Sequence, residues 1–419
     1  MLLQLDGDPL AANTPQDPRT PSLLKRGSRR LHGSASTVFA ESARLVELHR
    51  GIDLGIGAPD FECPDAVKQI AIAAIHDGRN QYSPIPGTPE LRRAVADHAA
   101  RFRHMAVDPD SMVLITSGAT AGVLCALLAL VDPGDEVVVF EPFYDAYPAQ
   151  IAFAGGVMRT VALHPPDDAH PAWWFDPDQL ASAFGPRTRV VLLNTPHNPT
   201  GKVFTAAELE AIAALCVRHE VVAVCDEVYE HIIHPGGGHV SLASLPEMAE
   251  RTITVSSGGK TFNATGWKVG WAIAAPPLRE LLLHTHQYVT ATVPAPFQAA
   301  IAAGLALPDC YFEELALGYA RRRQRLHDAL AAVALQAPPT QGTYYLLVDA
   351  HAAGFAGDRE FCRFLHEQVG IATIPCSAFF MPDRAGSTRW VRLAFCKPDR
   401  NLDAAADRLL RLGARGPTP

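Results

Sequence analysis

The 419-residue chain is 48% hydrophobic and 19% charged, which provides for a large core and exceeds what one compact unit usually holds. Its net charge of -8, without a long basic run, argues against a nucleic-acid partner. The longest apolar run, Val123–Val131, is too short to span a membrane. The eight cysteines form no C-x-x-C pair, and the N-terminus has an acid where a signal peptide would be apolar. We therefore expect a soluble, cytoplasmic protein.

Residues 1–35, rich in Pro, Asp and Arg, predict a flexible leader. After them, short apolar runs alternate with helical segments, as in the helix that the capping box Thr205–Glu208 opens and that runs to about His219. The predicted strands are Val137–Phe140, Arg189–Asn194, Val221–Cys225 and Arg251–Ser256. This alternation favours a mainly parallel α/β sheet covered by helices on both faces, with ligands bound at the carboxyl ends of the strands.

The pattern changes from about Leu305 onward. A predicted helix, Tyr319–Val333, leads to two strands, Gly342–Val348 and Trp390–Phe395, and then to a final helix. This order indicates a smaller α+β domain. The expected organisation is a flexible leader (1–35), an N-terminal segment packing with the small domain (36–65), a large cofactor-binding domain (66–304) and a small C-terminal domain (305–419).

Several polar residues follow predicted strands, where a site would form. Lys260 stands behind two glycines; alone it would be read as a surface charge, but a lysine amine also forms Schiff bases with aldehydes. Asp226 suits either a helix N-cap or a counter-ion for a pyridinium nitrogen, with Tyr229 within reach of the same ring. Asn198 lies in a turn that two prolines and a glycine would make rigid whatever its purpose; a second reading makes Asn198 a donor to the ring oxygen and to a substrate carboxylate.

Two further signals concern anions. Ser117–Thr120, including Gly118 and Ala119, opens an apolar helix and would present backbone N–H groups to a phosphate, assisted by Ser257 and Lys268. Arg392 lies between apolar residues on a predicted strand, where it is either an edge charge or a fork for a substrate carboxylate.

In this order and spacing, the motifs resemble those of fold-type-I aminotransferases. The resemblance runs from about Thr37 to Leu412 and is nearest to the branch of kynurenine/glutamine transaminases and N-succinyldiaminopimelate aminotransferases. The shared motifs are Asn80–Tyr82, Glu141–Tyr144, the Asn-x-Pro-x-Asn-Pro-x-Gly turn, Asp226–Tyr229, Lys260 and Thr265–Lys268. The implied fold is a large domain with a mainly parallel sheet of the seven-stranded type, flanked by helices, plus a small α+β domain.

The resemblance also implies roles. Pyridoxal 5'-phosphate would be held as a Schiff base on Lys260, which then serves as the base, while Asp226 holds the ring nitrogen and Tyr144 stacks on the ring. Tyr82 would reach the phosphate of a neighbouring subunit, making the working unit a homodimer. Gly57, Asn198 and Arg392 would bind the substrate carboxylate.

The chain departs from that branch at a few positions. Ile56 and Ala58 replace residues of a Gly-Gln-Gly-Phe-Pro motif, Ala121 stands where many relatives have Glu, and Ala291 replaces an aromatic of the substrate pocket. Phe39 is a candidate to restore some of that bulk.

We therefore expect an enzyme that moves an amino group from an L-amino acid to a 2-oxo acid by a ping-pong mechanism. Two alternatives on the same fold are a β-lyase acting on cysteine conjugates and an oxidase, because the same carbanion serves all three outcomes. A non-enzymatic regulator is disfavoured because the leader is too short to fold a DNA-binding module. No metal is expected.

Overall fold

The computed structural model describes Ser28, Arg30, Ser42, residues 51–381, Arg384 and residues 388–413. The chain divides into two units, Met1–Ala35 and Ser36–Pro419, and the elements below belong to the second unit. Phe39 and nearly all of the predicted leader lie outside the described residues. Within the described part, no helix is both long enough and apolar enough to cross a membrane.

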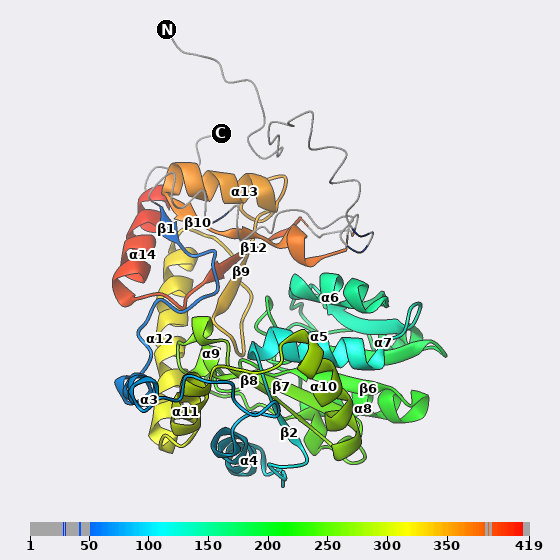
Figure 1. The fold of residues 1–419 in the computed structure, drawn as a ribbon. Coiled ribbons are helices and arrows are strands. Elements are labelled where there is room, and N and C mark those ends of the chain that lie inside the picture. Colours follow the sequence, from blue (N-terminus) through cyan, green and yellow to red (C-terminus); the bar gives the residue numbers. More distant parts are fainter. Residues whose placement is uncertain are drawn as a thin grey trace, which may run out of the picture. The chain divides into compact units, whose positions relative to one another are not determined.

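A seven-stranded sheet forms the larger part of the unit (Figure 1). Its order is β2 (Val113–Thr116), β8 (Gly270–Ala274), β7 (Thr252–Ser257), β6 (Val222–Asp226), β5 (Thr188–Asn194), β3 (Glu136–Glu141) and β4 (Val157–Ala162). The strands from β7 to β4 pair in parallel, whereas β8 is antiparallel to both of its neighbours. The predicted mainly parallel sheet is confirmed, and each of the four predicted strands lies within one residue of its observed bounds.

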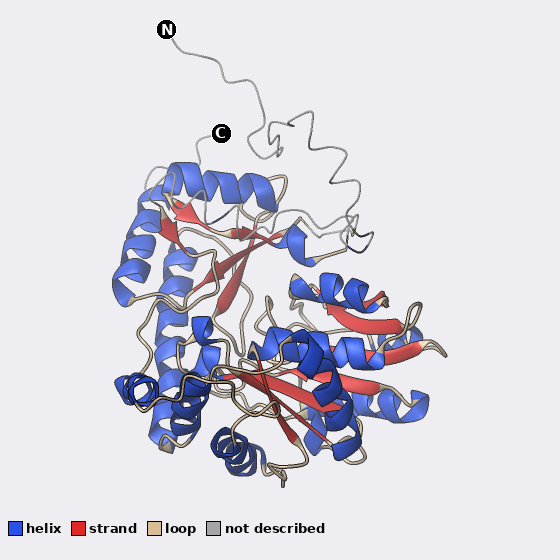
Figure 2. Cartoon of the chain, in the orientation of Figure 1, coloured by secondary structure: helices blue, strands red, loops and turns tan. Residues whose placement is uncertain are grey.

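Helices cover both faces of this sheet, because side chains alternate between the two faces along each strand (Figure 2). On β3, Val138 and Phe140 pack with one group of helices, and Val137 and Val139 with the other. The first group is α7 (Pro177–Ala183) and α8 (Ala206–His219); the second is α5 (Gly118–Leu130), α6 (Ala146–Ala154) and α10 (Pro276–Val289). Around β2 and β8 lie α3 (Asp65–His76), α4 (Pro89–Arg103) and α11 (Ala295–Leu305). The predicted capping box of α8 is present at Thr205 and Glu208.

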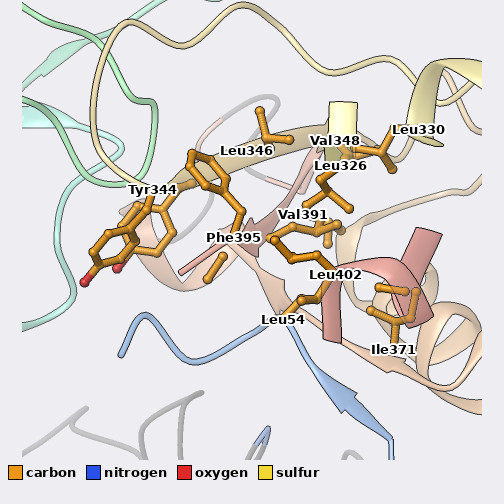
Figure 3. Close-up of a cluster of buried hydrophobic side chains, with 14 of the residues drawn as sticks. Leu54, Leu326, Leu330, Tyr344, Leu346, Val348, Ile371, Val391, Phe395 and Leu402 are labelled. Carbon is orange, nitrogen blue, oxygen red and sulfur yellow. The ribbon is translucent and has the colours of Figure 1, made fainter. Parts of the chain in front are cut away.

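Two small sheets and three helices surround a separate apolar core, part of which Figure 3 shows. The strands are β11 (Ile374–Pro375), β12 (Trp390–Ala394) and β9 (Tyr345–Asp349) in one sheet, and β1 (Ile52–Asp53) beside β10 (Ile371–Ala372) in the other. The helices are α12 (Asp309–Ala332), α13 (Asp358–Phe364) and α14 (Asp399–Gly413). Leu54, Tyr344 and Phe395 are fully buried in this core, so residues from both ends of the chain complete it.

The predicted bounds of two elements were wrong. Helix α12 begins at Asp309, ten residues before the predicted Tyr319, because Pro308 and the acidic Asp309 form a good helix start and the interior Gly318 is tolerated. Strand β9 begins at Tyr345 rather than Gly342, because Thr343 has the left-handed φ of 65° and cannot continue a strand.

Candidate active site

A cavity of about 280 Å³ lies where β5, β6 and β7 end. Asn194 and Asp226 are register partners at the ends of β5 and β6, and Ser257 ends β7 beside them. The sequence reasoning placed the ligand at such strand ends. Its candidate residues that line the cavity are Gly57, Gly118, Ala119, Thr120, Tyr144, Asn198, Asp226, Tyr229, Ser257, Lys260, Lys268 and Arg392.

Lys260 lies on the short helix α9 (Gly258–Thr261), directly after β7. Its Nζ donates to the Gly57 carbonyl at 3.1 Å, so the amine is aimed across the cavity at the opposite wall. Burial lowers the pKa of Lys260 to about 8, and the charges of Arg392 and Lys268 act in the same direction. A buried lysine with this pKa is neutral in a useful fraction of molecules near neutral pH, which nucleophilic chemistry requires.

Asp226 is buried at the end of β6, and the segment after it is a turn rather than a helix, so the N-cap reading does not apply. Its Oδ2 accepts a 2.7 Å hydrogen bond from the Tyr147 hydroxyl, and its Oδ1 accepts a weak 3.4 Å bond from Val228 N. Burial raises the pKa of Asp226 to about 6, against the effect of the Tyr147 hydrogen bond and of Lys260. A buried carboxylate with a weakly occupied oxygen is suited to a cationic N–H partner.

The start of α5 faces the cavity together with Lys268. A Cβ placed on Gly118 would lie 3.4 Å from Lys268 Nζ, so the ammonium stands beside the positive end of the helix. A Cβ on Gly270 would lie 2.6 Å from the carbonyl carbon of Gly118, so only glycine at that position lets β8 approach this helix start. Backbone N–H groups, the helix dipole and a lysine together fit a phosphate.

Tyr229 and Tyr345 form a pair of buried phenols, with their hydroxyl oxygens 3.2 Å apart. The Tyr345 hydroxyl also fills the space where a side chain on residue 57 would be, since a Cβ on Gly57 would collide with it. Gly57 is therefore required for packing as well as for its predicted contact with the substrate.

Arg392 is buried with 1% of its surface exposed, which excludes the edge-charge reading. Nη1 donates to Asn198 Oδ1 at 3.0 Å and Nη2 to the Gly55 carbonyl at 3.1 Å. The guanidinium also lies over the ring of Tyr345, 4.2 Å from its centroid. A guanidinium held in this way is preorganised for a carboxylate.

Tyr82 and Ala291, both singled out from the sequence, do not line this cavity, and neither does His197 of the Pro-rich turn. Tyr82 is 91% exposed, in a loop beside Thr292. Ala291 is exposed, between α10 and α11. His197 is buried and bonds Thr200 within its own turn.

Other lining residues were missed by the sequence reasoning. Tyr147 follows Tyr144 by three residues, a spacing that could have indicated a shared site; their rings meet edge-on at 5.5 Å. Gln150 donates to the Thr120 carbonyl at 2.9 Å and so supports the start of α5. Tyr345 carried no local signal, and Thr265 was named only as the first residue of a shared motif, without a role in the site. The further lining residues include Ile56, Asn194, Val228 and Gly259.

Comparison with known proteins places this chain among amino-group-transferring enzymes. The family model described as aminotransferase class I and II matches residues 49–409. The probable N-succinyldiaminopimelate aminotransferase DapC of Mycobacterium tuberculosis is 42% identical over 398 residues, 93% of this chain and 99% of that protein. The methionine aminotransferase of Escherichia coli is 38% identical over 377 residues, 90% and 96% of the two chains. The solved structure of the M. tuberculosis N-succinyldiaminopimelate aminotransferase superposes with a TM-score of 0.89 at 42% identity, over 92% of this chain and 100% of that one.

The chain belongs to the class I and II aminotransferases. It is a pyridoxal-phosphate-dependent enzyme that transfers an amino group between an amino acid and a 2-oxo acid. The resemblance seen in the sequence is confirmed, including the branch of N-succinyldiaminopimelate and kynurenine transaminases.

Proposed function

We propose that the described residues of the cavity divide the work as follows. Lys260 is the nucleophile and the base. Asp226 holds the ring nitrogen of the cofactor, and Tyr229 contacts the same ring. The start of α5, together with Ser257 and Lys268, binds the phosphate. Pyridoxal phosphate, when bound, supplies an aldehyde for an amine and a ring that accepts electrons from the reacting carbon. The arrangement that supports these roles is the convergence of an amine, a buried carboxylate and a helix start on one cavity.

Proton movement is assigned to Lys260. Its amine points at the Gly57 carbonyl, on the wall where the substrate carboxylate would be held, and its pKa of about 8 allows it to accept and return a proton. Arg392 and Asn198 orient the substrate carboxylate, which fixes the amino acid's α-carbon relative to that amine.

We further propose that the preferred amino donor has a neutral side chain. Among the described lining residues the cations are Lys260, Lys268 and Arg392, and each already has a role. A donor with a second carboxylate would then place it without a cationic partner, which is costly in a buried site. Ile56 adds an apolar surface to the wall. The relatives include enzymes named for methionine and kynurenine, which favours this choice, and one named for N-succinyldiaminopimelate, which does not.

The test is a spectral titration of the holoenzyme with single amino acids, with ammonia assayed in parallel. Methionine and aromatic amino acids should bleach the cofactor band faster than aspartate or glutamate, and a 2-oxo acid should restore it without release of ammonia. Faster conversion of the dicarboxylic donors would overturn the specificity proposal. Ammonia without an aminated product would instead indicate the lyase or oxidase reaction.

A homodimer is proposed as the working unit. Its support is the exposed Tyr82, whose loop lies beside Thr292–Ala295, since a large exposed aromatic is a common feature of contact surfaces. Tyr82 would then contribute to the cavity of the second copy. Light scattering should give about twice the 45.0 kDa chain mass at assay concentrations. An active monomer would contradict this proposal.

A reducing, cytoplasmic location is also proposed. Its support is the set of eight cysteines, which include no C-x-x-C pair and of which six are buried. Fractionation of cells with an antibody to the chain would test it, and recovery outside the cytoplasm would contradict it.

A further inference from the structure

Three side chains with metal-binding atoms meet outside the cavity. His98 lies on α4, and Glu230 and His231 follow β6 in sequence. The two histidine Nε2 atoms are 2.7 Å apart, and one ligand atom from each of the three residues falls within 4.8 Å of the others. None of the three lines the active-site cavity.

Buried charged side chains lie beside this cluster. Arg103 is paired with two buried carboxylates: its Nη1 lies 2.6 Å from Glu227 Oε2, and its Nη2 contacts Glu230. The side chains of Arg103, Glu227 and Glu230 are 7%, 0% and 3% exposed, so water does little to screen them. His239 and Ser241 also contact Glu227, with His239 Nε2 at 3.0 Å from Oε2 and Ser241 donating to Oε1 at 2.8 Å.

We propose that His98, His231 and Glu230 bind one Zn²⁺ ion. Two imidazole nitrogens and one carboxylate oxygen are a common ligand set for zinc, whereas Mg²⁺ and Ca²⁺ prefer oxygen ligands alone. A tetrahedral ion with bonds of about 2.0–2.1 Å needs ligand nitrogens about 3.3 Å apart, so the two rings must separate slightly from 2.7 Å. His231 is only partly buried, which leaves room for water as the fourth ligand.

Such an ion would tie α4 to the segment that carries the active-site acid. Asp226 and Tyr229 face the cavity, while Glu227 and Glu230, in the same five residues, face Arg103. Glu230 Oε1 also accepts a 2.6 Å hydrogen bond from Ser256, the residue before Ser257. A metal here would therefore stabilise the ends of β6 and β7 from the side opposite the cavity.

The experiment uses the tag-free holoenzyme, loaded with ZnCl₂ and passed through gel filtration before its metal content is measured. The wild-type protein should retain one Zn²⁺ per chain. Variants His98→Gln and His231→Gln should each bind Zn²⁺ at least about tenfold more weakly, because each removes a direct ligand. His284→Gln is the matched control, since His284 is exposed and pairs with Glu280 away from the cluster.

Thermal melts separate loss of metal from loss of fold. Zn²⁺ should raise the Tm of the wild-type protein and of His284→Gln, but not that of His231→Gln, whose metal-free melt should match the metal-free wild type. If His98→Gln does not fold, the zinc content and melting temperature of His231→Gln decide the test, because His231 is less buried than His98. The proposal is overturned if the wild-type chain retains no zinc, if both ligand variants retain it equally well, or if zinc anomalous scattering in crystals lies elsewhere.

Discussion

Replacement of Lys260 by alanine should abolish turnover. The variant loses both the amine that attaches the cofactor and the base that moves the proton, and a positioned base alone contributes about 10²–10⁴-fold to a rate. Lys260 is assigned both roles because burial lowers its pKa to about 8 and because its amine lies across the cavity, 3.1 Å from the Gly57 carbonyl. Steady-state assays with the best donor and the cofactor absorption of the variant would measure the effect.

Two comparisons show whether this loss is chemical. The cofactor should still bind Lys260→Ala without a covalent link, because the start of α5 and Lys268 remain, and a small primary amine diffusing into the cavity should restore part of the activity. Lys268→Ala serves as the control, since it should keep the covalent link and lose the cofactor more readily on dialysis. Normal turnover by Lys260→Ala would refute the assigned mechanism.

Arg392→Ala should lower kcat/KM for amino acids by about 10²–10³-fold, mainly through KM. Loss of one partner from a buried charged contact costs about 2–5 kcal/mol, and each 1.36 kcal/mol corresponds to about tenfold. Arg392 is buried and held by Asn198 and Gly55, and the other cations among the described lining residues, Lys260 and Lys268, are assigned to the cofactor. Initial rates over a range of donor concentrations would separate KM from kcat.

A substrate without the carboxylate distinguishes binding from folding. The amine formed by decarboxylating the best donor should react at a similar slow rate with the wild-type enzyme and with Arg392→Ala, because it has no carboxylate for the Arg392 guanidinium to bind. Arg392→Lys keeps the charge but loses the bidentate geometry, so its kcat/KM for amino acids should lie between the values of the wild-type enzyme and of Arg392→Ala. An equal loss of activity toward amino acid and amine would assign Arg392 a structural role instead.

The local sequence was sufficient to predict four strands of the seven-stranded sheet and the position of several residues that line the cavity. The apolar residues Val190–Leu193 of β5 are buried on both faces and need no distant information to be read as a strand. Asp226 and Lys260 follow such runs directly, and the ends of parallel strands meet at one edge of a sheet. For this reason their convergence could be inferred before the structure was known.

The tertiary structure decided the features that depend on residues distant in the sequence. Arg392 had two readings, and its burial against Asn198, 194 residues away, selects one of them. Three contacts had no local signal in the sequence, because the two partners lie on different elements. They are Tyr147 with Asp226, Tyr345 with Gly57, and His98 with His231. Local patterns encode which face of an element is buried, but contacts between elements follow from how the whole chain packs, and this packing set the fine structure of the site.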